Sequence, residues 1–82
     1  ETPIVTVFPS PVKDRLHIFS AFEESDTPAQ LIIYDISGRL LFKESRPYRN
    51  EDEIDFSQAQ PGVYFVHLIY KEERLVFKVV KE

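Results

Sequence analysis

Short runs of strand-forming residues, each ended by a strand breaker, restrict the fold of this chain more than any other feature. Stretches rich in Val, Ile, Leu, Phe and Tyr recur along the sequence, and Pro, Gly, Ser or acidic clusters separate them. No longer window keeps its apolar residues at helical spacing, which argues against a long helix. Repeated short strands with turn signals between them are typical of an all-β sandwich.

Seven such runs predict seven strands. We expect these strands at residues 4–8, 15–20, 30–35, 39–45, 52–56, 62–70 and 74–80. This count resembles that of the immunoglobulin type, so we predict an all-β fold, an immunoglobulin-like β-sandwich of about seven antiparallel strands. A chain of 82 residues can bury one small core and no second one. We therefore expect a single domain at residues 1–82 and, because no Met is present, a fragment of a larger protein.

Two of the connections carry recognisable turn residues. Asp35 can accept hydrogen bonds from backbone N–H groups ahead of it, and Gly38 tolerates a positive φ, so we predict a type I turn closed by a G1 bulge and a hairpin between the third and fourth strands. Pro61 directly before Gly62 fits a type II turn. The charged residues 71–74 suit a four-residue loop that closes the last hairpin.

The other connections are less regular. Pro9 and Pro11 cannot donate to a strand ladder, so the first strand should end there, and we expect a corner between the two sheets. Residues 21–29 and 45–53 are polar and contain no Gly, and we predict exposed loops at both.

Composition excludes several classes of partner. Ten Lys and Arg against fourteen Asp and Glu give a net charge of −4, which argues against a nucleic-acid partner. The longest apolar run, residues 62–70, is much shorter than a membrane-spanning helix. Without cysteine there is no disulfide framework and no thiolate metal site.

No group of residues predicts an enzyme, a cofactor or a metal site. His17 and His67 each lie between apolar neighbours, so strand alternation should turn both rings outward. Neither a nucleophile elbow nor a zinc-binding helix motif accompanies them. Two carboxylate sets could gather calcium ligands, but neither has the spacing of a calcium loop, and we interpret both as solvated. The sets are Glu51, Asp52, Glu53 and Asp55, and Glu23, Glu24 and Asp26.

Apolar residues occupy both faces of several predicted strands. If Tyr64, Val66 and Leu68 point inward, then Val63, Phe65 and Ile69 point outward. A two-sheet sandwich covers only its inner faces, so such an outer face implies a docking partner, a preceding domain or self-association. Open edge strands could also accept a strand, with partial protection from Lys78, Lys81 and Glu82.

The order of motifs resembles a known family. It runs through Phe8-Pro9-Ser10-Pro11, Leu16-His17-Ile18, Ile33-Tyr34-Asp35-Ile36-Ser37-Gly38-Arg39-Leu40-Leu41, Ile54-Asp55-Phe56-Ser57, Pro61-Gly62-Val63-Tyr64-Phe65-Val66 and Phe77-Lys78-Val79-Val80-Lys81. This arrangement resembles the C-terminal sorting domain, type A, of the type IX (Por) secretion system, over almost the whole chain. The chain departs from the family pattern at Ser10, where Asn is typical, and at Ala59, where Leu is common.

The resemblance implies a non-enzymatic sorting signal at the C-terminus of a secreted cargo protein from a Bacteroidetes-type bacterium. The implied partners are the type IX secretion machinery, its sortase and the N-terminal cargo domains. The implied route passes through the periplasm to the outer membrane, where the sortase removes the signal and the cargo is attached to lipopolysaccharide on the cell surface. The family's recognition elements correspond to residues 62–64 and 78–81.

We place recognition on the last hairpin, with apolar contact through the strand at 62–70 and steering by lysines. The residues are Gly62, Val63, Tyr64, Phe65, Ile69, Lys78, Val79, Val80 and Lys81, and the structural turns are Pro9, Pro11, Asp35, Gly38, Pro61 and Gly62. Exposed apolar faces and open edge strands also favour a homodimer of the isolated domain. The alternative function is a structural or adhesive immunoglobulin-like module that binds a protein or a carbohydrate.

Overall fold

The computed structural model describes residues 5–20 and 25–82, and this part of the chain contains seven strands. The strands are β1 (Val5–Phe8), β2 (Arg15–Ser20), β3 (Ser25–Asp35), β4 (Leu40–Tyr48), β5 (Glu51–Asp55), β6 (Gly62–Tyr70) and β7 (Glu73–Lys81). The predicted all-β class and the number of strands are confirmed.

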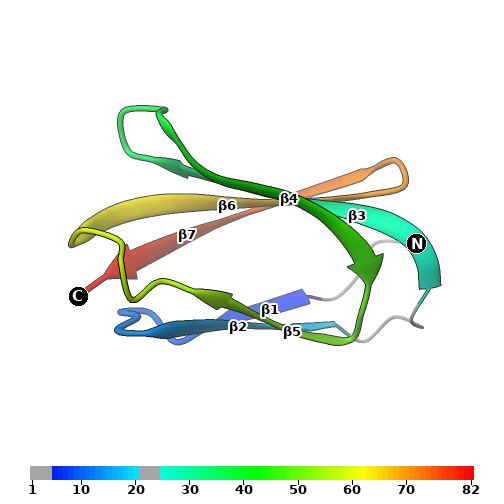
Figure 1. Ribbon diagram of the computed structural model, residues 1–82, viewed down its shortest axis with the longest axis horizontal. Coiled ribbons are helices and arrows are strands. Elements are labelled where there is room, and N and C mark those ends of the chain that lie inside the picture. The colour runs from blue at the N-terminus through cyan, green and yellow to red at the C-terminus, as the bar shows by residue number, and fades with distance from the viewer. Residues whose placement is uncertain (1–4, 21–24) are drawn as a thin grey trace.

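The strands form two antiparallel sheets that face each other (Figure 1). One sheet has three strands in the order β1-β2-β5, and the other has four in the order β4-β3-β6-β7. Two layers of this kind make a β-sandwich, so the predicted architecture is confirmed. The last two strands pair along their whole lengths, as predicted, from Gly62 opposite Lys81 to Tyr70 opposite Glu73.

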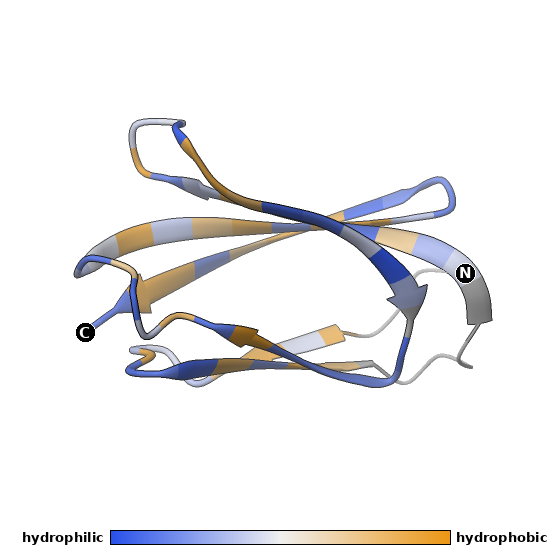
Figure 2. Ribbon diagram, in the orientation of Figure 1, coloured by the Kyte–Doolittle hydropathy of each residue, from blue (hydrophilic) through white to orange (hydrophobic). Residues whose placement is uncertain are grey.

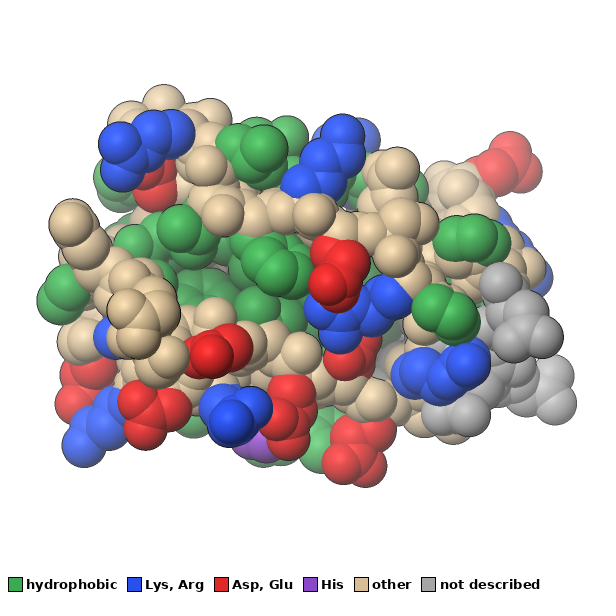
Figure 3. Space-filling view, viewed as in Figure 1, with side chains coloured by type: hydrophobic (Ala, Val, Ile, Leu, Met, Phe, Trp, Pro, Cys, Tyr) green, Lys and Arg blue, Asp and Glu red, His purple; other side chains and the backbone are tan. Residues whose placement is uncertain are grey.

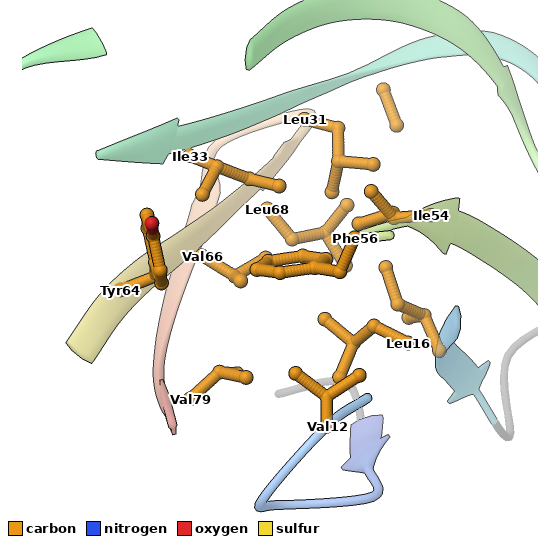
Figure 4. Close-up of a cluster of buried hydrophobic side chains, with 12 residues drawn as sticks. Val12, Leu16, Leu31, Ile33, Ile54, Phe56, Tyr64, Val66, Leu68 and Val79 are labelled. Atoms are coloured by element: carbon orange, nitrogen blue, oxygen red, sulfur yellow. The ribbon is translucent and has the colours of Figure 1, made fainter. Parts of the chain in front are cut away.

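The core lies between the sheets and takes alternate residues from both (Figure 4). Phe56, Leu16, Ile33, Val12, Val66 and Val79 are its largest fully buried side chains. Alternation along β6 is regular, because Tyr64, Val66 and Leu68 are buried while Val63, Phe65, His67 and Ile69 are half-buried. The inward and outward sets predicted for this strand are therefore confirmed.

Two predicted loops are partly wrong, because strands continue into them. β3 begins at Ser25 rather than at residue 30, and β4 continues to Tyr48 rather than ending at residue 45. Pairing of Ala29 with Arg46 and of Pro28 with Pro47 extends the two strands together. A strand ladder is formed by backbone groups, so polar residues and prolines can take part in it near an edge or a bulge. Such a segment has no alternating apolar pattern from which a strand could be predicted.

The connection after β1 returns to the same sheet, so the predicted corner between sheets is wrong. β1 and β2 are hydrogen-bonded neighbours, with Val7 opposite Ile18. The connecting segment nevertheless contacts the other sheet, because Val12 forms a parallel bridge with Lys81 at the end of β7. The Val12 N–H donates to the Val80 carbonyl at 2.7 Å, and the Glu82 N–H donates to the Val12 carbonyl at 2.9 Å. These long-range bonds close one side of the sandwich.

The last hairpin has a tighter turn than predicted. Tyr70 pairs directly with Glu73, so residues 71–72 make a two-residue turn instead of a four-residue loop. Lys71 has φ of +55°, in the left-handed region that short hairpin turns require. A charged sequence without Gly gave no sign that one of its residues would adopt this conformation.

Candidate recognition surface

The outer face of the four-stranded sheet is apolar across its central strands. The register places Tyr34, Phe65 and Lys78 in one row across β3, β6 and β7. The next row contains Ile32, His67 and Val76. Figure 2 shows hydrophobic positions along β6 and β7 and hydrophilic ones at the turn that joins them. No described segment crosses this face, since both sheets use their inner faces for the core.

Exposure differs across this surface, which we call the outer face. Ile32 is only 8% exposed, whereas Val76 and Leu40 are each 51% exposed at its two sides. The rings of Tyr34 and His67 meet edge to face with their centroids 5.2 Å apart. The centre is therefore packed, and its margins expose apolar side chains to a partner.

A shallow groove of about 340 Å³ lies on this face beside the β3–β4 turn. Its lining includes Tyr34, Phe65, His67 and Ile36. Ile36 is 72% exposed at the tip of the turn. The His67 Nδ1 atom is buried and has no hydrogen-bond partner among the described residues.

The β3–β4 turn has the predicted form. The Gly38 N–H donates to the Asp35 carbonyl, and the Asp35 N–H donates to the Arg39 carbonyl, both at 2.9 Å. Gly38 has φ of +88°, as a G1 bulge requires. Hydrogen bonds from the Ser37 hydroxyl and from the backbone of Arg39 and Ser37 to the Asp35 carboxylate lower the pKa of Asp35 below its ordinary 3.8.

The turn before β6 differs from the predicted one. Gly62 has φ of +152°, far from the +80° of a type II turn, although the positive φ that the prediction required is present. The chain is fixed here by the Tyr64 hydroxyl, which donates to the Gln60 carbonyl at 2.7 Å. Tyr64 also packs edge to face against Phe56, with ring centroids 5.6 Å apart. This tyrosine corner resembles that of immunoglobulin-like domains, and the sequence reasoning missed it.

The structure separates the predicted recognition residues into two groups. Val63, Phe65, Ile69 and Val80 are half-buried, and Lys78 is exposed. Tyr64 and Val79 are buried in the core, at 6% and 1% exposed. Lys78 and Lys81 are an odd number of positions apart in β7, so they point to opposite sides of the sheet.

The histidines face outward, as predicted. His67 belongs to the outer face, and His17 lies on the outer side of the three-stranded sheet with Phe8 and Phe19. The two phenylalanine rings stack there with centroids 5.1 Å apart. The His17 Nδ1 atom is 3.8 Å from a carboxylate oxygen of Glu53.

The first carboxylate set is divided among other partners. Glu53 pairs with Arg15 at 3.2 Å, and Asp52 pairs with Arg46 at 2.6 Å. Hydrogen bonds from Ser57 and the charge of Arg15 lower the pKa of Asp55. Glu23 and Glu24 of the second set, and the side chain of Asp26, lie outside the described residues. Within the described ranges no three His, Asp or Glu residues converge on a common point.

Charged residues also link the free edges of the two sheets, a feature that the sequence reasoning missed. Arg46 on β4 contacts Glu44 and reaches Asp52 on β5. In Figure 3 acidic and basic side chains cross the opening between the sheets, and hydrophobic side chains show beside them. Arg46 and Asp52 are six positions apart in the sequence, and this spacing across a short connection was the available signal.

These features define a small β-sandwich whose distinctive surface is an apolar sheet face, with turns and edges around it. Residues 6–82 match the Por secretion-tail family, described as the secretion system C-terminal sorting domain. The chain therefore belongs to this family and is a sorting signal of the type IX secretion system. It acts together with the type IX machinery and with an attached cargo protein that passes to the outer membrane or cell surface.

The search of curated proteins found no match to this chain. The family match does not support the alternative of an adhesive module. The family is one of sorting signals and is not known for enzymatic activity. Among the described residues no helix is both long and apolar enough to span a bilayer.

Proposed function

We propose that the secretion machinery recognises this folded domain through its outer face and its last hairpin. The observation that carries the proposal is the set of apolar side chains in adjacent rows across β3, β6 and β7, which no described segment covers. Phe65 and Ile69 supply the apolar contact from β6. Exposed Lys78, in the same row as Phe65, supplies positive charge for orientation.

The remaining predicted residues have supporting roles in this proposal. Buried Tyr64 and Val79 hold the two strands in place, and Val63 and Val80 continue the apolar surface toward the end of the hairpin. Gly62 begins β6 after the turn. Lys81 points away from the outer face, and its Nζ donates to the Glu82 carbonyl at 3.2 Å, so we assign it to the end of β7 rather than to the contact.

The finer steps of the route belong to the same proposal. The domain is the C-terminal label of a larger secreted protein, passes the periplasm attached to its cargo, and has no enzymatic activity of its own. A sortase removes it, and the cargo is then attached to the cell surface. The family membership of residues 6–82 supports this sequence of events.

Isolated copies of the domain would use the same face to form a homodimer. Leu40 and Val76, at 51% exposed each, favour this association once the machinery is absent. Such a dimer would cover the surface that the machinery needs, so it belongs to the free domain and not to the exported form.

The test is export of a reporter protein fused to the domain. Phe65→Thr combined with Ile69→Thr should lower export about tenfold or more, because two apolar anchors are lost from the contact. Lys78→Ala should slow export, and Lys81→Ala should leave it near the parent level. Each variant is first shown to be folded by its thermal unfolding.

Two outcomes would contradict the proposal. Normal export of the folded Phe65→Thr, Ile69→Thr variant would exclude the outer face as the contact. Equal losses from Lys78→Ala and Lys81→Ala would mean that recognition does not depend on the side of the sheet.

A further inference from the structure

The outer edge of β7 is paired at its C-terminal end, and no other described strand pairs with the rest of it. At Val80 both backbone groups point away from β6. The Val80 carbonyl accepts from Val12 at 2.7 Å, and the Val80 N–H donates to the Ser10 hydroxyl at 3.2 Å. The segment around Val12 therefore begins a fifth position in the four-stranded sheet, parallel to β7, and then leaves it.

The direction of the backbone groups along the rest of the β7 edge follows from that at Val80. In an antiparallel ladder the hydrogen-bonded and non-hydrogen-bonded pairs alternate. Because Val80 does not bond Val63 across the ladder, the same holds for Lys78, Val76 and Arg74, which pair with Phe65, His67 and Ile69. Their N–H and C=O groups point to the open side of β7, along roughly 17 Å of strand.

The side chains along this edge are cationic on both sides of an apolar residue. Arg74 and Lys78 are exposed, and Val76 between them is 51% exposed. Neither cation has an ion pair within the described ranges, although the protein as a whole carries a net charge of −4. A local positive stripe on an acidic domain favours an acidic partner.

We propose that the β7 edge from Arg74 to Lys78 accepts an extended acidic segment of the secretion machinery, added to the sheet as a further strand. This inference rests on the proposed function and gives it a partner segment. The segment carries two acidic residues four positions apart, opposite Arg74 and Lys78, and a small apolar residue midway between them, opposite Val76. Backbone bonds supply affinity, and the charges fix the register.

A second copy of this chain fits the edge poorly. Antiparallel pairing of two β7 strands about Val76 would set Arg74 of one copy opposite Lys78 of the other. Like charges directly opposite each other destabilise a strand pair. The same two cations that attract an acidic strand therefore discourage self-association along this edge.

The first experiment measures binding of a blocked heptapeptide, Thr-Glu-Thr-Val-Thr-Glu-Thr, to the 82-residue chain by amide chemical shifts. The peptide should shift and protect the amides of Arg74, Val76 and Lys78, and replacing both Glu with Lys should weaken it about tenfold. Arg74→Glu combined with Lys78→Glu should reverse this preference. Binding that maps to another strand, or a preference that does not reverse, would overturn the inference.

Val76→Pro tests the backbone bond, with Val76→Thr as its matched control. Proline removes an N–H that points to the open side and leaves the β6–β7 ladder intact, so the fold should persist. Peptide binding should be lost in Val76→Pro and kept in Val76→Thr. A dimer of the unmodified domain that persists in Val76→Thr but becomes a monomer in Val76→Pro would mean that the edge itself binds a second copy, and the inference would be wrong.

Export of the reporter fusion separates this inference from the proposed function. Both hold if Val76→Pro and the Phe65→Thr, Ile69→Thr variant each fail to export. If Val76→Pro exports like Val76→Thr while the outer-face variant fails, the edge inference falls and the proposed function stands. If Val76→Pro fails to export while the Phe65→Thr, Ile69→Thr variant exports normally, the edge inference stands and the outer face is excluded as the contact.

Discussion

Tyr64 shows how one side chain can fix the start of a strand. Its ring is in the core against Phe56, and its hydroxyl reaches back to the Gln60 carbonyl at 2.7 Å. The bond spans the turn that Pro61 and Gly62 form, so it sets the direction in which β6 leaves. The sequence places Tyr64 on the inner face by alternation, but the hydroxyl bond depends on a turn geometry that alternation does not specify.

Tyr64→Phe should lower the free energy of unfolding by about 1 kcal/mol, because it removes this bond and keeps the ring. Tyr34→Phe is the control, since its hydroxyl has no hydrogen bond within the described ranges and its ring contacts His67. Urea unfolding of both variants measures the difference. Equal stability of the two variants would show that the hydroxyl bond contributes nothing.

Asp35 makes the stability of the β3–β4 turn depend on pH. Its pKa is lowered in the folded state, mainly by the Ser37 hydroxyl and the Arg39 N–H. A lowered pKa means that the stabilising contribution is complete above the ordinary value of 3.8 and is lost as the pH falls through the lower folded value. Asp55 behaves in the same way through Ser57.

Asp35→Asn should flatten the loss of stability below about pH 4, because the group no longer titrates. Adding Asp55→Asn should flatten it further. Thermal unfolding at a series of acid pH values measures both slopes. An unchanged slope in the double variant would place the acid sensitivity elsewhere.

At the scale of elements, predictions succeeded where a few neighbouring residues decide the structure. The Asp35 to Gly38 turn is of this kind, because one carboxylate and one glycine determine it. Alternation along β6 is another, since burial of one face is a local pattern. The β3–β4 turn and the outward residues of β6 form much of the outer face, so the candidate site was largely predictable.

Predictions failed where distant segments decide the structure. The extension of β3 and β4 depends on pairing of Ala29 with Arg46 and of Pro28 with Pro47, which no alternating apolar pattern marks. The segment at Val12 depends on its bonds to β7, at the other end of the chain. Arg46 and Asp52 meet only because β4 and β5 are edges on the same side of the sandwich. Apart from the short spacing between Arg46 and Asp52, no local residue pattern identifies these partners.

A hollow of about 190 Å³ lies between β4 and β5 at Ala59, a position where Leu is common in the family that the sequence resembles. Its lining includes Leu41, Phe42 and Phe56. Ala59→Leu should fill part of it and raise the free energy of unfolding by about 1 kcal/mol. Ser45→Leu, on the exposed part of β4, adds the same bulk elsewhere and should gain less. Urea unfolding compares them, and a destabilised Ala59→Leu variant would mean that the hollow cannot accept the larger side chain.

Different interactions join the two sheets at the two sides of the molecule: backbone hydrogen bonds at one side and a side-chain ion pair at the other. Val12 and Ser10 join the two sheets at the end of β7, whereas Arg46 and Asp52 provide the link between the edge strands β4 and β5. The core between them is continuous and includes Phe56 at 1% exposed. The outer face exists only when this core holds the four-stranded sheet together, so the recognition surface that we propose is a property of the folded domain.

The most direct measurement is export of an unrelated reporter fused to the intact domain or to a Phe56→Asp variant, whose buried charge should unfold it. Cells with a working type IX system should export the first fusion and retain the second, and cells without the system should retain both. Equal export of the two fusions by the type IX system would show that the linear sequence is read, and would contradict recognition of a folded surface.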